Sequence, residues 1–508
     1  MNKKFLLCLL LISIKCDTNS YDYTNYAAVS KNTDLSEQTL SSTTSDQSVV
    51  YITESGKTIT NSNINKESGD SSNTENSEFY GINAAVLVNG GGLTITGGTI
   101  STSAKGANAL CTTNNGKVNI SGTKITSTAS SSARGLHATY GGEITASNVE
   151  ISSTGGSCAN LATDRGEGTV TCDECTLSTA GAGSPLIYST GNITVSKTTG
   201  TATKAQAVVV EGKNTATVKE SSNLNCYGLP NAENNIDICG VMLYQSMSGD
   251  ADSGTSTFNC QSSTITIDSQ SSVYDSAPMF FITNTDAMIN LDSCTFTYGS
   301  NIFLKAGGTS RWGSTGSNGG VVTLNLKNQN VVGNFVVDEY SGLTINLENS
   351  SIQGTINSEK TGAKVVINID ESSTITLTGN SYYTSINNGK SDGSNIIKGS
   401  YTFDSYEEKD IERPSGNGGT GSGNPPSGGS GNPPEPPSGG SGKPPSGGSG
   451  NPPEPPSGGS GNPPGSSNEG NPTKSSSGNS TEESSTNEAK GNKDFIKMIL
   501  GLMIVLVL

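Results

Sequence analysis

The fold is decided by six short apolar segments: Ala85-Val-Leu-Val88, Ala109-Leu-Cys111, Leu136-His-Ala138, Ala159-Asn-Leu-Ala162, Pro185-Leu-Ile-Tyr188 and Ala207-Val-Val-Val210. Their first residues lie 22 to 27 positions apart, which is the spacing of a solenoid repeat. Glycine- or asparagine-rich corners follow most of them, and such residues accept the tight backbone conformations that a corner requires.

Two more alternating strands complete most repeats. The second strands are Leu93-Thr-Ile-Thr96, Val118-Asn-Ile-Ser121, Glu143-Ile-Thr145, Thr169-Val-Thr171 and Ile193-Thr-Val195. The third strands are Thr99-Ile-Ser101, Lys124-Ile-Thr126, Val149-Glu-Ile151 and Thr176-Leu-Ser178. Three strands per repeat predict an all-β, right-handed parallel β-helix, in which stacked coils share one apolar interior. Tandem immunoglobulin-like sandwiches are the alternative, but they do not explain the recurring order of three strands.

Composition agrees with an elongated fold and excludes some partners. Apolar residues make up 31% of the 508-residue chain and aromatic residues 5%. These fractions are low for a globular core but sufficient for a narrow solenoid interior. The net charge of −16 comes without a basic cluster, which argues against nucleic acid as a partner. The charge pattern indicates a solvated surface.

The amino-terminal part of the chain divides into three segments. Residues 1–16 are typical of a secretory signal peptide, since Lys3 and Lys4 precede a short apolar run. Residues 17–47 are polar and predict a disordered segment. Residues 48–403 contain the recurring strands and predict the β-helix domain.

The carboxy-terminal part predicts a stalk and an anchor. Residues 404–492 form a Pro/Gly/Ser-rich stalk predicted to be disordered, with sixteen of the nineteen prolines between Pro414 and Pro472. The apolar residues 493–508 are too short for a transmembrane helix and match a glycosylphosphatidylinositol signal. A short anchor helix is the alternative. The small residues that could accept the lipid are Ser484, Ser485, Asn487 and Ala489.

Cysteines and sequons suggest an oxidised, glycosylated protein. Eight cysteines remain after the signal peptide, and in a secreted chain they predict disulfides: Cys111, Cys158, Cys172, Cys175, Cys226, Cys239, Cys260 and Cys294. Cys226 and Cys239 bracket an insertion, so we expect them to pair. Cys172 and Cys175 have no second Cys-x-x-Cys pair or histidine cluster, so a zinc site is not predicted. Glycosylation acceptors are Asn119, Asn192, Asn349 and Asn479.

No motif indicates an active site. Asn284-Thr-Asp286 matches one fragment of the polygalacturonase pattern, whose other fragments are missing. The single histidine, His137, has no acidic neighbour in sequence and is expected to be structural. Asp250 and Asp252 resemble the start of a calcium loop but lack its downstream glutamate, and Trp312 is expected to cover apolar surface. We therefore predict no cofactor.

Threonine pairs suggest one further surface. Thr-x-Thr pairs such as Thr94-Ile-Thr96 resemble flat ice-binding faces. The pairs lie at unequal intervals along the chain, so we expect their register to vary from coil to coil.

Several coil segments resemble adhesin-like right-handed β-helix proteins of the pectin-lyase-like superfamily. The segments are Gly91-Gly-Leu-Thr-Ile-Thr-Gly-Gly-Thr-Ile100, Ala133-Arg-Gly-Leu-His-Ala-Thr-Tyr-Gly-Gly142, Leu161-Ala-Thr-Asp-Arg165, Gly240-Val-Met-Leu-Tyr-Gln-Ser-Met-Ser-Gly-Asp250 and Arg311-Trp-Gly313. The resemblance covers roughly residues 48–403 and implies the fold. It also implies attachment to surfaces, but it transfers no catalytic residue.

Three functions are therefore compatible with the sequence. The first is a non-catalytic protein, anchored to the cell surface through a carboxy-terminal lipid, that binds carbohydrate or another surface ligand. The second is a lyase or hydrolase of acidic polysaccharides whose site is assembled from distant coils. The third is a structural component of a wall or coat.

Overall fold

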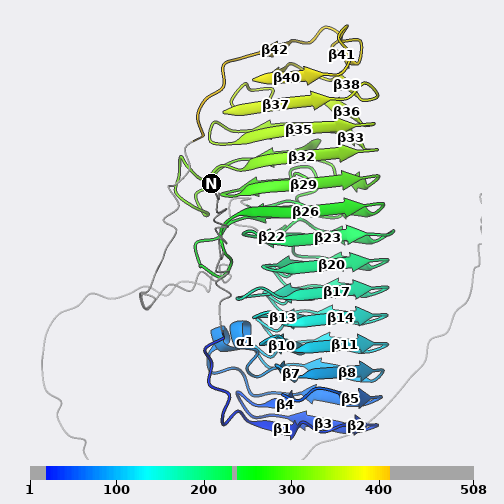
Figure 1. The fold of residues 1–508 in the computed structure, drawn as a ribbon, viewed down its shortest axis with the longest axis vertical. Helices are drawn as coiled ribbons and strands as arrows, with labels where there is room; N and C mark the ends of the chain where they lie inside the picture. Colours follow the sequence, from blue (N-terminus) through cyan, green and yellow to red (C-terminus); the bar gives the residue numbers. More distant parts are fainter. Residues whose placement is uncertain (1–18, 231–236, 412–508) are drawn as a thin grey trace, which may run out of the picture. The chain divides into compact units, whose positions relative to one another are not determined.

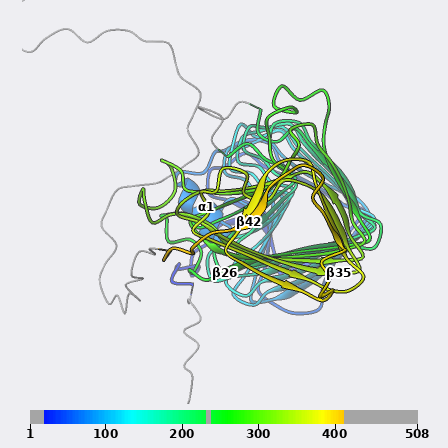
Figure 2. The same cartoon turned by 90° about the horizontal axis from the view of Figure 1, so that it is seen from above.

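A computed structural model describes residues 19–230 and 237–411, and it confirms the parallel β-helix. Strands stack in parallel along one axis (Figure 1), and three sheets enclose a triangular interior when the solenoid is seen from its end (Figure 2). The predicted signal peptide, most of the stalk and the anchor lie outside the described residues. Among the described residues, no helix is long and apolar enough to cross a membrane.

Most coils contribute one strand to each of three sheets. The first sheet contains β1 (Ala28–Lys31), β4 (Ser48–Ile52), β7 (Val86–Asn89), β10 (Leu110–Thr113), β13 (Leu136–Ala138), β16 (Leu161–Thr163), β19 (Ile187–Ser189), β22 (Val208–Glu211), β25 (Val241–Tyr244), β28 (Phe280–Thr283), β31 (Ile302–Ala306) and β34 (Asn334–Val337). The second contains β2 (Leu35–Ser36), β5 (Lys57–Thr60), β8 (Gly92–Thr96), β11 (Lys117–Ser121), β14 (Glu143–Ser147), β17 (Thr169–Asp173), β20 (Asn192–Ser196), β23 (Thr215–Lys219), β26 (Thr255–Gln261), β29 (Asp286–Asp292), β32 (Val321–Lys327), β35 (Gly342–Glu348), β37 (Lys364–Ile369) and β40 (Ser385–Asn388).

The third sheet is shorter. It contains β3 (Thr39–Ser42), β6 (Asn63–Lys66), β9 (Thr99–Thr102), β12 (Lys124–Ser127), β15 (Glu150–Ser153), β18 (Thr176–Thr179), β21 (Thr199–Ala202), β24 (Asn223–Cys226), β27 (Thr264–Ile267) and β30 (Thr295–Thr297). Two small parallel sheets complete the last coils: β33 (Asn330–Val332), β36 (Ser351–Gly354), β38 (Thr374–Leu377) and β41 (Ile396–Ile397), and then β39 (Ser381–Tyr383) with β42 (Phe403–Ser405).

The alternation of side chains separates the interior from the surface. In β11, Val118 and Ile120 are buried while Asn119 between them is exposed, as expected for a strand whose side chains alternate between faces. Strand pairing places Val118 beside Leu93 of β8 and Ile144 of β14. Apolar side chains thus stack on apolar side chains from coil to coil, and the interior is continuous.

The first coil begins earlier than predicted. Strands β1, β2 and β3 occupy residues 28–42, inside the segment predicted to be disordered, so that prediction is wrong for this part. Tyrosines provide the apolar surface that the polar composition concealed. The Tyr26 ring packs edge-on against Tyr51, with 5.0 Å between the centroids, and the Tyr26 hydroxyl lies 2.7 Å from Ser48 Oγ.

One short helix, α1 (Thr74–Tyr80), interrupts the coils and was not predicted. Asn73 caps its amino terminus by accepting a hydrogen bond from the Glu75 amide, and Gly81 ends it with a φ of 71°. These two residues are ordinary helix boundary signals. The helix is only seven residues long, which leaves little periodicity to read in the sequence.

A buried lysine gives the amino-terminal coil a pH-dependent stability. The Lys66 ammonium donates hydrogen bonds to the carbonyls of Thr44 and Gln47, and the residue is fully buried. Burial lowers the pKa of Lys66 from 10.5 to about 8. Between these values the unfolded chain binds the proton and the folded chain does not, so the free energy of unfolding rises with pH in this window.

Lys66→Met should abolish this rise. We expect urea midpoints of the wild type to increase between neutral pH and about pH 9, and those of Lys66→Met to change less over the same range. Equal pH slopes in the two proteins would show that Lys66 is not the group responsible.

Candidate functional site

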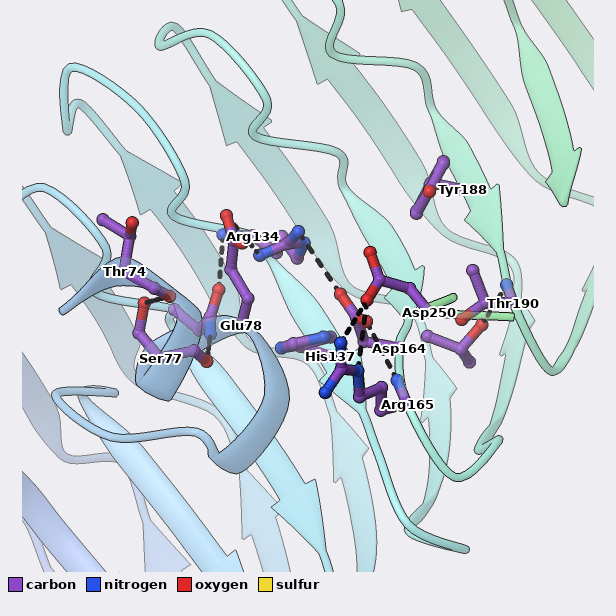
Figure 3. A network of polar contacts seen from close by, with 12 residues as sticks. Thr74, Ser77, Glu78, Arg134, His137, Asp164, Arg165, Tyr188, Thr190 and Asp250 are labelled. Carbon is purple, nitrogen blue, oxygen red and sulfur yellow. Dashed lines mark hydrogen bonds and ion pairs between the residues drawn. The ribbon is translucent and has the colours of Figure 1, made fainter. Parts of the chain in front are cut away.

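A polar network lies buried on the outer face of the first sheet. Its side chains come from successive strands of this sheet and from residues next to them, with Glu78 from α1 and Asp250 from the loop 245–254 (Figure 3). Strand pairing aligns one outward row in the order Leu87, Cys111, His137, Ala162 and Tyr188. The segments covering this face bury charged and aromatic side chains together, so we treat it as the first candidate site.

Arg134 is the central cation of this network. It lies just before β13 and is 8% exposed. Its guanidinium nitrogens lie 3.6 Å from Glu78 Oε1 of α1 and 3.5 Å from Asp164 Oδ2, which follows β16. Burial raises the pKa of Asp164 to about 8, and the charge of Arg134 opposes that rise. One arginine therefore joins the helix to the sheet through two carboxyl groups.

Arg165 is a second cation that joins covering segments. Its guanidinium lies 4.0 Å from the centroid of the Phe79 ring of α1 and donates to Asp250 Oδ1 from Nε at 3.1 Å and from a terminal nitrogen at 2.9 Å. In the same loop, Asp252 lies 2.9 Å from Lys213 Nζ. Asp250 and Asp252, which resemble the start of a calcium loop in the sequence, are therefore ion-pair partners, and the described residues contain no cluster of three metal-binding side chains.

His137 is fully buried between Cys111 and Arg134. Its Nδ1 lies 3.8 Å from Cys111 Sγ, and its Nε2 has no hydrogen-bond partner. Burial, and secondarily the charge of Arg134, lowers the pKa of His137, so the ring is neutral. A neutral, enclosed imidazole without a carboxylate partner is a packing element.

Glu211 is the second buried carboxylate of the face. It is 1% exposed and accepts hydrogen bonds from the hydroxyls of Tyr188 and Tyr244, the latter at 2.7 Å. Burial raises the pKa of both tyrosines, so the phenols stay protonated and keep donating. Glu211 Oε1 has no partner.

The loop containing Trp312 covers the adjacent part of the face. The Trp312 ring packs on Tyr244 with 4.8 Å between the centroids, and its Nε1 donates to Asp237 at 3.1 Å. Arg311 pairs with the same carboxylate at 2.8 Å. Burial raises the pKa of Asp237, against the opposing effect of Arg311. The prediction that Trp312 covers apolar surface is confirmed.

The second sheet has the opposite character, because its outer face is open and uncharged along its centre. Strand pairing aligns one threonine or asparagine from each of thirteen successive coils: Thr58, Thr94, Asn119, Thr145, Thr171, Thr194, Thr217, Asn259, Asn290, Asn325, Asn346, Asn368 and Asn387. We call this the Thr/Asn row. The prediction that the Thr-x-Thr register varies is confirmed, because Thr169-Val-Thr171 is shifted by two residues relative to Thr94-Ile-Thr96, and the two pairs share only the position of Thr94 and Thr171 in the row.

The asparagines of the row form a hydrogen-bonded ladder. Asn290 Nδ2 donates to Asn259 Oδ1 at 2.8 Å, Asn325 to Asn290 at 2.7 Å, and Asn346 to Asn325 at 2.7 Å. This part of the row lies in a surface groove that is also lined by Lys219, Asp292, Lys327 and Glu348. A second groove crosses the third sheet and is lined by Thr176, Thr199, Asn225, Asp268 and Tyr274, among others.

The cysteines differ from the prediction. Cys260 and Cys294 form a disulfide between consecutive coils. Cys226 and Cys239 are buried free thiols, so their predicted pairing is wrong: Cys226 lies against the Gly240 carbonyl and Cys239 against the Asp237 carbonyl. The other free, buried cysteines in the described chain are Cys111, Cys158, Cys172 and Cys175.

The other residues singled out in the sequence do not lie together in one site. Asn119 and Asn192 are exposed on the second sheet, and Asn349 is exposed in a turn where it donates to Asn328. Asn284 donates to the Gln245 carbonyl and belongs to a loop contact. Asn479 and the four predicted anchor residues lie outside the described residues.

Sequence reasoning missed the residues that make the covered face. Arg134, Asp164, Glu211 and Asp237 are scattered over a hundred residues and share no motif. A charged residue next to an apolar strand, as in Val208–Glu211, was the available signal. Comparison of the chain with protein-family models, with curated proteins and with solved structures gives no match, so any function must be argued from the sequence and this geometry.

Proposed function

We propose that this protein is a non-catalytic, carbohydrate-binding β-helix protein displayed at the cell surface, and that the Thr/Asn row is its contact surface. The observation that carries the proposal is the row itself. Hydroxyl and amide side chains recur in every coil from Thr58 to Asn387, with neighbours about 4.8 Å apart. An extended glycan lying along the solenoid axis would meet equivalent groups at regular intervals.

The hydrogen-bonded ladder fixes the orientation of the asparagine amides that a polar ligand would contact. Each asparagine amide has two N–H donors and two acceptor lone pairs. Asn290 uses one donor toward Asn259 and one acceptor position toward Asn325. Its other donor and lone pair are free of the ladder, and the ladder fixes their direction. Preorganised donors and acceptors reduce the entropy lost on binding.

The acidic and basic groups of the covered face support a non-catalytic role. Asp164, Glu211 and His137 are almost fully buried, and the first two are engaged with Arg134 or with tyrosine hydroxyls. A general acid or base must come within hydrogen-bond reach of a substrate. The covering segments stand between these side chains and any polymer outside.

The proposal that the β-helix is displayed at the cell surface is based on the sequences at the two ends of the chain. A signal peptide, a stalk and a lipid-anchor signal would secrete the β-helix and hold it away from the membrane. Membership of the pectin-lyase-like superfamily belongs to the same proposal, supported by the parallel β-helix and by the coil segments that resemble it.

The glycan surface can be tested with two double variants. Asn290→Leu with Asn325→Leu removes two amides from the row at nearly constant shape, and Thr176→Val with Thr199→Val does the same in the groove of the third sheet. On a glycan array, the first pair should weaken binding about tenfold or more, at about 1 kcal/mol per lost hydrogen bond. The second pair should bind normally.

Other outcomes redirect the proposal. Loss of binding only in the Thr176/Thr199 variant would move the site to the third sheet. Thermal melts of the wild type and of both double variants show whether a loss of glycan binding comes from lost contacts or from unfolding. An array without any binding would favour the structural coat protein.

A polysaccharide lyase or hydrolase is the second candidate, because Arg134, Asp164, Glu211 and His137 gather on one face. Incubating the purified protein with pectins and other acidic glycans distinguishes it. Unsaturated or reducing-end products, absent with a Glu211→Gln variant, would overturn the non-catalytic proposal.

A further inference from the structure

We propose that Cys172 and Cys175 are a second disulfide site, closing within one coil the same corner that Cys260 and Cys294 close between two coils. Cys172 lies near the end of β17, and Cys175 directly precedes β18. Both side chains point into the solenoid interior, where Cys172 is 0% and Cys175 is 2% exposed. The two side chains are close enough to interact with each other, and Cys175 Sγ also donates to the Asp173 carbonyl at 3.5 Å.

The backbone brings the two residues together. Glu174, between them, has a φ of 57°, and a left-handed residue allows the chain to turn sharply at the corner. The bend at Glu174 lies between the end of β17 and the residue before β18, so the two cysteines flank one corner of the solenoid. A disulfide there requires Cα atoms about 4.4 to 6.8 Å apart, which the Cys-Asp-Glu-Cys spacing can span across a bend.

The existing disulfide occupies the same two rows. Strand pairing runs from Cys172 through Val195 and Val218 to Cys260. Cys175 and Cys294 each stand immediately before a strand of the third sheet, and pairing links those strands through β21, β24 and β27. Both pairs therefore combine one cysteine of the row that ends the second-sheet strands with one of the row that precedes the third-sheet strands, within one coil for Cys172 and Cys175 and across two coils for Cys260 and Cys294.

The neighbouring coil shows what this corner contains without sulfur. Ala146 is the pairing partner of Cys172, and Val149 holds the place of Cys175 in the preceding coil. Both are buried apolar residues. Alanine and valine fill this corner in the preceding coil. The packing of the interior therefore does not require cysteines at positions 172 and 175.

The chemistry is thiol–disulfide exchange with a small-molecule disulfide, or with the disulfide of an oxidoreductase, in the secretory pathway. Both thiols are enclosed in the folded interior, so the exchange takes place before this coil closes. The thiolate of one cysteine attacks the disulfide and releases one thiolate of the oxidant. The other cysteine then loses its proton, attacks the sulfur of the first and displaces the second thiolate. The protein loses two protons and two electrons, and the oxidant becomes two thiols.

The test uses the full chain secreted from a eukaryotic host. Trypsin releases residues 166–197 as one peptide, in which Cys172 and Cys175 are the only cysteines. After alkylation in denaturant without reductant and removal of any glycan from Asn192, this peptide should be unlabelled and two hydrogens lighter than the reduced form. After reduction it should take two labels. Two labels without reductant, or a cross-link to another peptide, would overturn the proposal.

A matched variant separates bonding from packing. Cys172→Ala with Cys175→Val copies the pair of the preceding coil. It should fold and keep Cys260–Cys294 by peptide mapping. Its denaturation midpoint should fall less on adding reductant than that of the wild type. The single variant Cys172→Ala should expose Cys175 to alkylation in denaturant. An equal response of wild type and double variant to reductant would contradict the proposal.

Discussion

Replacing Arg134 by methionine is expected to lower the free energy of unfolding at pH 8 by about 3–5 kcal/mol, as for other buried ion pairs that lose one partner. The substitution leaves Glu78 and Asp164 as carboxyl groups without their shared cation, and both are buried or nearly so. The loss should be larger at about pH 9 than at pH 8, because Asp164 of the wild type ionises beside Arg134 above its pKa of about 8, whereas in the variant the pKa of Asp164 lies higher still. Urea denaturation followed by circular dichroism measures both values.

A charge-matched control identifies the cause. Adding Glu78→Gln and Asp164→Asn to Arg134→Met neutralises all three groups, and it should recover most of the lost stability at pH 8. If the triple variant is as unstable as Arg134→Met alone, the loss comes from the packing of the arginine side chain. An Arg134→Met protein as stable as the wild type at both pH values would show that the network does not hold α1.

The substitution Phe280→Ala should be comparably severe and independent of pH. Phe280 is fully buried in the interior, and its ring centroid lies 5.3 Å from Phe303, 5.4 Å from Phe296 and 5.7 Å from Phe258. Truncating a buried phenylalanine removes its transfer energy and leaves a cavity, which together cost about 3–5 kcal/mol. The stacked coils on both sides cannot collapse into the space without breaking strand pairing.

Val332→Ala is the appropriate comparison. Val332 is an exposed strand residue, with 67% of its surface accessible, and its truncation should change stability by less than about 0.5 kcal/mol. Similar urea midpoints for the two variants would contradict the assignment of Phe280 to a tightly packed interior.

The sequence predicts the solenoid well because each coil repeats the same local signals. Alternation in segments such as Val118–Ser121 identifies strands directly, and unequal repeat lengths do not hide it. The register between strands of neighbouring coils is harder to predict than the strands themselves. Residues between Thr94 and Thr217 recur at unequal intervals, so the Thr/Asn row becomes visible only when the corners are known to absorb the extra residues.

The covered face could not be predicted for a different reason. Arg165 and Asp250 are 85 residues apart, and nothing local indicates that the loop 245–254 reaches back across several coils. Cys226 and Cys239 illustrate the converse error. Proximity in sequence suggested a bond, yet Cys226 belongs to a strand of the third sheet and Cys239 precedes a strand of the first.

The Cys260–Cys294 disulfide has a mechanical consequence for the carboxy-terminal tether that we propose. Hydrogen bonds between coils run along the solenoid axis, so tension on the chain peels coils away one after another from the loaded end. The covalent link joins residues 34 positions apart in consecutive coils. When the coils have separated as far as Cys294, the disulfide passes the tension directly to Cys260. The residues between the two cysteines then do not lengthen the extended chain. The bond therefore keeps residues 261–293 from being extended, and the coils before Cys260 carry the load next.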